Sequence, residues 1–308
     1  MIGIVSNFLA VGFAAISAGM VGWVWGRRLF NPMMAVVGVL IVMMDVGVAI
    51  VAHFGRRPVV AVMAALLWGF YFTNWRYLKF RAMLSRVILI AALGVVVVAM
   101  FTAIRGRERM GAATVAQKMA GADVKRGLGL LGAGQQIGAA SLWAIENYPE
   151  KFEYRHLMTL QYLFLNNVPR MWWPEKPKPL SSFIATQARI RYVRQEKITM
   201  PAGIIGYAAA EGGWYAVVVY AIFFGLFLRF FDELLLKNPF SPFAVLPVGC
   251  TIGQVVGLPR GDPSLFANNM IITFIGTWLL MTAMSKLLEM SAVSQYRHQA
   301  TPVQSQAG

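Results

Sequence analysis

Long apolar runs, separated by short segments rich in basic residues, dominate the chain. A transmembrane helix needs about 20 mostly apolar residues. Seven runs approach or reach that length: residues 4–25, 33–52, 59–73, 87–104, 204–228, 243–258 and 266–284. The sixth run contains Pro247 and Gly249, so we expect a broken helix there, with its freed backbone groups satisfied by protein or water.

The spacing of these runs divides the chain into four parts. Residues 1–104 form a group of about four transmembrane helices, 105–203 a long basic loop, 204–284 a group of about three transmembrane helices, and 285–308 a polar tail that we expect to be disordered. The first run lacks a basic start and carries its charges after the apolar stretch, so we expect a retained span rather than a cleaved signal peptide.

Basic residues in short loops predict the orientation in the membrane. The loop 74–86 carries four of them, Arg76, Lys79, Arg81 and Arg86, and such loops stay on the cytoplasmic side. Alternation then puts the C-terminus in the cytoplasm and the long loop outside, although Arg56 and Arg57 oppose this assignment. The fold class predicted is an all-α polytopic membrane protein with about seven transmembrane helices and one long, partly helical extracytoplasmic loop.

Composition supports a membrane protein. The 308 residues are 58% hydrophobic and 13% charged, whereas soluble domains carry roughly 25% charged residues. The formal charge of +15 would indicate nucleic acid in a soluble protein. Here we attribute it to lipid head groups, topology signals and an anionic substrate, with no nucleic-acid partner. A single cysteine, Cys250, excludes an internal disulfide.

The long loop holds much of this charge. Residues 105–199 contain 15 of the 28 basic residues and 7 of the 13 acidic ones. Because long loops translocate regardless of their charge, topology does not explain the excess. Either the loop is a solvated surface resting on lipid phosphates, or it forms a cleft for a phosphorylated, membrane-bound substrate. Within it, residues 154–168 predict an amphipathic helix along the membrane surface, ended by Pro169.

A proline-rich elbow follows this predicted helix. Its sequence is Pro169-Arg170-Met171-Trp172-Trp173-Pro174-Glu175-Lys176-Pro177-Lys178-Pro179. Adjacent tryptophans favour either a membrane interface or stacking against a sugar ring. The basic side chains suit phosphate, since arginine offers a planar fork of donors.

The elbow resembles the Pro-Arg-x-x-Trp-Pro-x-Lys-Pro signature of Wzy-type O-antigen and exopolysaccharide polymerases. Residues 206–214 are similar to the family's next glycine-rich segment, although Tyr207 stands where a glutamate is usual and Glu211 follows four residues later. Arg260, in Pro259-Arg260-Gly261-Asp262, matches an arginine in a later outer loop. The resemblance covers residues 154–284.

Membership of that family would imply an enzyme of the bacterial cytoplasmic (inner) membrane. It would polymerise undecaprenyl-pyrophosphate-linked oligosaccharide repeat units at the outer leaflet, without a cofactor or metal. Its partners would be the lipid-linked oligosaccharide, membrane lipids, and a chain-length regulator and flippase of the same pathway. Two needs follow: cations for the pyrophosphate leaving group, and a base or orienting group for the acceptor hydroxyl.

The candidate site residues follow from these two needs. For the pyrophosphate we expect Arg170 and Arg260, helped by Lys176 and Arg191; for catalysis Glu211, Tyr207 and His156; for the sugar Trp172, Trp173 and Trp214. Each has a structural alternative. Arg191 belongs to a cluster typical of a solvated face, Arg260 could be an interface anchor paired with Asp262, and Glu211 could form a structural salt bridge.

Three further features of the sequence give no additional catalytic or binding residues. Scattered acidic residues and few Cys or His predict no metal site. The glycine-rich stretch 127–134 lacks a preceding strand, so we expect a turn rather than a nucleotide loop. Asp45 interrupts the second apolar run, and we expect it to pack against a polar partner such as His53 or an arginine.

Three other functions remain open at this point. An O-antigen ligase would use the same donor but transfer the glycan to lipid A core. A lipid-linked glycan transporter would place charges at mid-membrane, often in two repeated halves. A non-catalytic scaffold of a polysaccharide-assembly complex would need no site at all.

Overall fold

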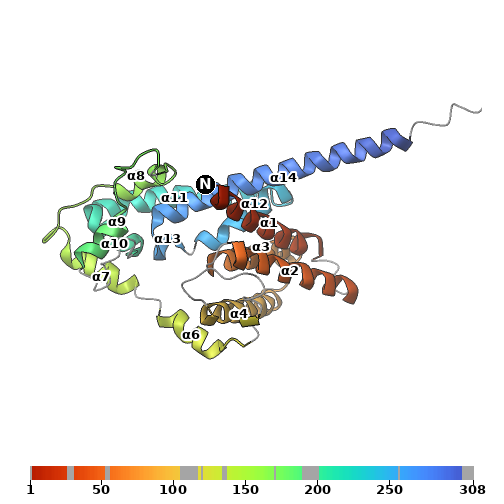
Figure 1. Ribbon diagram of the computed structural model, residues 1–308, viewed down its shortest axis with the longest axis horizontal. Helices are drawn as coiled ribbons and strands as arrows, with labels where there is room; N and C mark the ends of the chain where they lie inside the picture. Colours follow the sequence, from red (N-terminus) through yellow and green to blue (C-terminus); the bar gives the residue numbers. More distant parts are fainter. Residues whose placement is uncertain are drawn as a thin grey trace, which may run out of the picture.

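The computed structural model describes residues 2–25, 31–52, 56–104, 117–118, 121–133, 137–169, 171–188, 201–255 and 257–299. Every regular element in these ranges is helical (Figure 1). The helices are α1 (Ile2–Trp25), α2 (Pro32–Ala52), α3 (Arg56–Thr73), the 3-10 turn η1 (Trp75–Tyr77), α4 (Phe80–Ile104), α6 (Val124–Ala133), α7 (Ile137–Asn147), α8 (Met158–Leu165), α9 (Leu180–Gln187), α10 (Gly203–Gly212), α11 (Trp214–Lys237), α12 (Pro242–Val255), α13 (Gly257–Arg260) and α14 (Pro263–Gln299). The all-α prediction is confirmed.

Five helical segments among the described residues are long and apolar enough to cross a membrane. They are Pro32–Val51, Phe80–Ala103, Trp214–Lys237, Pro242–Arg260 and Pro263–Leu287. Two shorter apolar helices, Ala10–Trp25 and Pro58–Thr73, belong to α1 and α3. The chain is therefore a helical membrane protein by length and composition, while the total of seven spans stays a prediction.

Helices α1 and α3 pack backbone against backbone at the centre of the bundle. A Cβ placed on Gly22 would lie 2.4 Å from the carbonyl oxygen of Leu66, and one on Gly69 would lie 2.3 Å from that of Gly19. Small residues let membrane helices approach this closely, because lipid supplies no hydrophobic driving force between them. Helix α12 lies against the same pair, with Gly249 facing Trp68.

The expected break at Pro247 and Gly249 is not where the helix ends. Helix α12 runs through both residues to Val255, and α13 begins at Gly257. Residues 244–251 are all buried in the bundle, so neighbouring helices surround the backbone that the proline leaves unbonded. That environment tolerates proline within a membrane helix.

The fifth apolar run, by contrast, is divided by a turn. Helix α10 ends at Gly212 and α11 begins at Trp214, with Gly213 between them at φ 58° and ψ −133°. A positive φ strains residues with a side chain, and glycine adopts it freely. The predicted span from residue 204 is therefore two helices, and α10 lies outside the segments that could cross the membrane.

Much of the predicted outer loop is folded. Helix α6, expected as a turn, packs on α4 so closely that a Cβ on Gly127 would lie 2.0 Å from the Ala99 carbonyl oxygen. Helices α7, α8, α9 and α10 gather at one end of the molecule, beside α13 (Figure 1). Buried residues of α7, α9 and α10 form a small core there, including Ala144, Ile184 and Tyr207.

Helix α14 extends past the predicted end of the last span at residue 284 and continues to Gln299. The expectation of disorder from residue 285 is therefore wrong as far as residue 299. The polar composition favoured a tail, but this stretch contains neither glycine nor proline, so nothing ends the helix. Its C-terminal part projects away from the bundle (Figure 1).

The close contact between α1 and α3 gives a first test. We expect Gly22→Ala to destabilise the protein by about 1–3 kcal/mol, because the added methyl group forces the two backbones apart. Gly12→Ala is the matched control on the same helix, since a Cβ there meets nothing within 4 Å. Thermal melting of both variants in detergent measures the difference. Equal melting temperatures for the two would contradict this packing.

Candidate functional site

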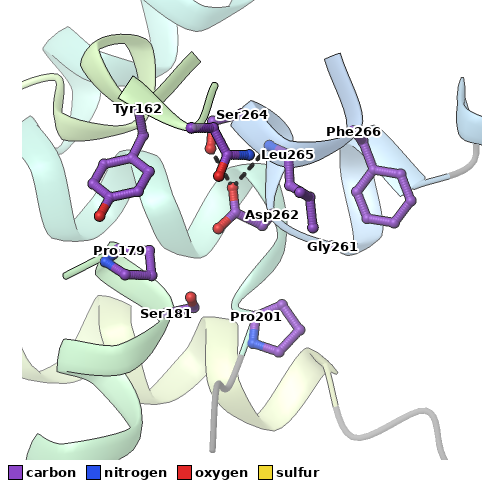
Figure 2. Close-up of a pocket in the computed structure, with 10 residues that line it drawn as sticks. Tyr162, Pro179, Ser181, Pro201, Gly261, Asp262, Ser264, Leu265 and Phe266 are labelled. Atoms are coloured by element: carbon purple, nitrogen blue, oxygen red, sulfur yellow. Dashed lines mark hydrogen bonds between the residues drawn. The ribbon is translucent and has the colours of Figure 1, made fainter. Parts of the chain in front are cut away.

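A partly enclosed pocket of about 190 Å³ lies where α8, the start of α9 and the corner between α13 and α14 meet (Figure 2). Its lining residues come from segments more than 100 positions apart in the chain: Tyr162, Asn166, Pro179, Ser181, Pro201, Gly261, Asp262, Ser264, Leu265 and Phe266. The proline elbow contributes Pro179, and the Pro-Arg-Gly-Asp segment contributes Gly261 and Asp262.

Asp262 presents the one carboxylate among these lining residues. Its Oδ1 accepts hydrogen bonds from Ser264 Oγ at 2.6 Å and from the backbone N–H of Leu265 at 3.3 Å, which caps the N-terminus of α14. Its Oδ2 accepts the Tyr207 hydroxyl at 3.1 Å. A carboxylate has about four acceptor positions, so Oδ2 keeps one for a ligand in the pocket.

Glu211 lies behind this wall, with no exposed surface. The backbone N–H of Thr159 donates to Oε1 at 3.0 Å and to Oε2 at 3.1 Å, and the hydroxyl groups of Thr159 and Tyr220 donate to the same carboxylate. One side chain thus joins α10 to the start of α8 and to α11. Glu211 accepts hydrogen bonds where the sequence offered a salt bridge as its structural alternative.

Burial changes the acidity of both polar residues of α10. It raises the pKa of Glu211 to about 7, against the opposing effect of hydrogen bonds from Thr159 and Tyr220 and with a small contribution from the Asp262 charge. Burial, followed by the Asp262 charge, raises the pKa of Tyr207 well above its ordinary value. Tyr207 therefore stays a neutral hydrogen-bond donor to Asp262 at neutral pH.

Lys176 anchors the proline elbow. It is 8% exposed, and its ammonium donates to the carbonyl oxygens of Val168 at 3.1 Å and Asn166 at 3.5 Å. It also lies 5.6 Å from the centre of the Tyr162 ring, whose hydroxyl donates to the Pro177 carbonyl. This arrangement gives Lys176 a structural role at the end of α8. Its predicted contact with pyrophosphate stays a prediction.

The remaining predicted cations differ in what the structure describes. Arg170 and Arg191 lie outside the described residues. Arg260 ends α13 and is exposed, and within the described part of the chain it forms no ion pair with Asp262. The alternative of an anchor paired with that aspartate therefore gains no support.

The other predicted site residues lie on the surface. His156 is exposed, and its ring centre is 6.2 Å from that of Tyr154. Trp172, Trp173 and Trp214 are 72%, 39% and 84% exposed, and none of the three lines the pocket.

The sequence pointed to Asp262 only as a partner for Arg260, and it did not predict Tyr162 or Ser181 as site residues. The Asp-Pro-Ser order at the start of the last span is a helix-capping signal and could have located the side chain of Asp262. No local pattern predicts that Ser181 and Tyr162 share a pocket with it, because the contacts join distant segments.

Asp45 is buried in α2, 4% exposed. Its hydrogen-bond partner is Ser17 of α1, rather than an arginine, while His53 lies outside the described residues. Its Oδ2 has no hydrogen-bond partner among the residues described. Within the same residues, no three His, Cys, Asp or Glu side chains gather as metal ligands.

No family model, curated protein or solved structure matches the chain.

Glu211 gives a test of the buried network. Its folded pKa of about 7 exceeds the ordinary value of 4.5, so the folded protein binds the proton more tightly. Stability is then greatest below the ordinary value, falls as the pH rises towards 7, and levels off above it, a loss of about 3 kcal/mol. We expect Glu211→Gln to lose this dependence, because glutamine does not ionise.

The measurement is the melting temperature of detergent-solubilised protein between pH 5 and pH 8. Glu233→Gln is the control, since Glu233 is partly exposed and pairs with Arg229, and it should keep the wild-type slope. A Glu211→Gln variant with the same slope as the wild type would show that Glu211 does not titrate in this range.

Proposed function

We propose that the protein polymerises undecaprenyl-pyrophosphate-linked oligosaccharide repeat units at the outer leaflet of the bacterial cytoplasmic membrane. One observation carries the proposal: the end of the proline elbow and the Pro-Arg-Gly-Asp corner line one pocket, and α10 contacts the wall of that pocket. The elbow contributes Pro179, α10 contributes Tyr207 through its bond to Asp262, and the Pro-Arg-Gly-Asp corner contributes Asp262 itself. A concave pocket with a few convergent polar groups is the usual form of a ligand site, which supports the proposal.

The reaction is a glycosyl transfer that needs no nucleotide. The bond between the anomeric carbon of the donor glycan and the pyrophosphate oxygen breaks, and its electron pair leaves with the lipid pyrophosphate. A hydroxyl oxygen of the acceptor unit bonds to that carbon and loses its proton. The protein has to stabilise the leaving pyrophosphate and to accept the proton.

Asp262 suits the proton transfer, since its Oδ2 reaches the pocket with one acceptor position unused. Tyr207 holds that oxygen by donating to it, and Glu211 fixes α10, which carries Tyr207. In this proposal Glu211 and Tyr207 position the base, and His156, which is exposed on the surface, is a second candidate base.

Arg260 suits the leaving group. It is exposed two residues before Asp262, so a cation and a carboxylate lie on the same corner of the fold. A planar guanidinium matches pyrophosphate oxygens with paired hydrogen bonds. Arg170 and Arg191 are proposed as additional pyrophosphate ligands, and Lys176 as the residue that holds the elbow in place.

The exposed tryptophans support a location at the membrane surface. Trp214 opens α11 at one end of a candidate span, and Trp172 lies in the elbow; both are largely exposed. Tryptophan is favoured at the boundary between lipid and water. These rings would hold the pocket at the height where a lipid-linked sugar emerges, and they remain proposed sugar contacts for longer substrates.

Of the alternatives, a ligase would use the same donor and the same corner, so only the product separates it from a polymerase. A transporter needs polar groups along a path through the membrane. In the described spans, the buried carboxylate of Asp45 lies at the contact between α1 and α2. The pocket lies at the other end of the molecule, beside α8, α9 and α10 (Figure 1). That separation favours surface chemistry over transport.

We expect Asp262→Asn to lower polymer formation by about 10²–10⁴-fold, the usual effect of losing a general base. Arg260→Ala and Arg170→Ala should likewise abolish long polymer, because the pyrophosphate loses a cation. Each variant is expressed in a deletion strain, and the lipid-linked glycans are sized by mass spectrometry. Single repeat units should accumulate.

Asp232→Asn is the matched control, because Asp232 is exposed and pairs with Arg229 away from the pocket; it should restore polymer. Membrane levels of every variant are compared by immunoblot. Normal amounts of long polysaccharide in both Asp262→Asn and Arg260→Ala would contradict the assignment of these residues to the site. In the deletion strain itself, capped long chains left on the carrier would indicate a ligase, and units trapped on the inner leaflet a flippase.

A further inference from the structure

The walls of the pocket beside Asp262 are of two kinds (Figure 2). Hydrogen-bonding groups come from Asp262, Ser181, Ser264 and Asn166, and flat apolar surfaces come from the rings of Pro179, Pro201 and Tyr162. A pyranose ring also has two kinds of surface, since hydroxyl groups surround its edge and C–H groups cover its faces. The lining therefore matches a sugar better than a purely apolar or a purely ionic ligand.

The size of the pocket limits how much of a glycan it holds. A volume of about 190 Å³ is on the scale of one monosaccharide. A whole repeat unit or a polyprenyl chain does not fit. The pocket is thus a subsite for one ring, with the rest of the ligand outside.

The charges of the pocket limit which ring it holds. None of its described lining residues is a lysine or arginine. Lys176, the nearest buried cation in the elbow, donates to two backbone carbonyls, and Arg260 is exposed outside the lining. Asp262 lies in the wall, and Glu211 is close enough behind for their charges to interact. Within the described residues, a second anion here would meet the like charges of Asp262 and Glu211, and Lys176, the described cation beside the lining, is held against the carbonyl oxygens of Asn166 and Val168.

We propose that this pocket holds the acceptor end of the growing glycan, as a single neutral hexose or N-acetylhexosamine ring, and excludes acidic sugars and pyrophosphate. The assignment of the ring to the acceptor rests on the proposed function. The preference for a neutral ring rests on the lining alone. The attacking hydroxyl donates to the unused position of Asp262 Oδ2. The donor pyrophosphate then lies outside the pocket, on the side of Arg260.

Ser181 provides a second means of positioning the ring. It is 3% exposed, lines the pocket, and hydrogen-bonds with the Tyr207 hydroxyl. A side chain larger than serine would project into the space that the ring needs. Its neighbour Ser182 does not line the pocket, which makes the pair Ser181→Leu and Ser182→Leu a matched comparison of blocked and open pockets.

The test measures binding of small glycosides to the purified full chain in lipid nanodiscs by saturation-transfer NMR. The neutral probes are the methyl glycosides of glucose, galactose, mannose, N-acetylglucosamine and N-acetylgalactosamine; the acidic probes are methyl glucuronide and methyl galacturonide. At least one neutral probe should bind, and neither acidic probe should compete with it. Asp262→Asn should weaken the neutral probe about tenfold, since it removes a charged acceptor, and should admit a uronide.

Ser181→Leu should abolish the binding that Ser182→Leu keeps. Binding of a uronide in preference to every neutral probe, equal binding by Ser181→Leu and wild type, or no binding of any probe would overturn the inference. If Ser181→Leu does not fold, Asp262→Asn alone decides, because loss of a negative charge in a preformed wall should reverse the order of neutral and acidic probes.

Failure of this inference differs from failure of the proposed function. A deletion strain that makes normal polymer, together with the expected glycoside selectivity, would leave a neutral-sugar site in a protein that is not a polymerase. Accumulated single repeat units together with preferred uronide binding would leave a polymerase whose acceptor site has the opposite selectivity.

Discussion

The buried carboxylate of Glu211 is the interaction on which the arrangement of the candidate site depends. Taking a carboxylate out of water is costly unless hydrogen bonds replace the lost hydration, and Thr159 and Tyr220 supply those bonds from α8 and α11. Because the three helices must come together to satisfy this one group, they fix the position of α10. Tyr207, one turn earlier on the same buried face, is then directed at Asp262.

The corner between α13 and α14 carries opposite charges on its two sides, a carboxylate facing the pocket and a guanidinium on the exposed side. One oxygen caps α14 and the other faces Tyr207 and the pocket, so the cavity is lined by a carboxylate, hydroxyl groups and apolar rings. Arg260 stands on the exposed side of the same corner. A glycosyl transfer from a lipid pyrophosphate needs these two environments next to each other, one for an uncharged nucleophile and one for an anionic leaving group. The cation and the carboxylate lie within three residues of chain, Arg260 to Asp262, which suits the proposed reaction.

The membrane part of the protein is held by a different kind of contact. Glycines of α1, α3 and α12 bring helix backbones together where larger side chains would collide, while the outer faces of α2, α4 and α11 carry exposed Leu, Val, Ile and Met side chains. Those faces need no protein partner in lipid. The small core of α7, α9 and α10 buries apolar residues against one another, although Leu142, Ile145 and Ile205 on the outer side of these helices are exposed.

The sequence by itself determined that the chain is helical and suited to a membrane. The length of an apolar run is a local property, and the thickness of the bilayer sets the length that a spanning helix needs. It also marked the elbow, the segment at Glu211 and the corner at Arg260 by resemblance. Tertiary structure decided the rest. Only packing shows that α12 passes through Pro247, that Gly213 ends α10, and that Lys176 bonds to backbone carbonyls instead of facing outwards. Asp262 became a pocket residue for the same reason: its neighbours Tyr162, Ser181 and Tyr207 lie 55 to 100 positions away, and no local pattern encodes contacts over that separation.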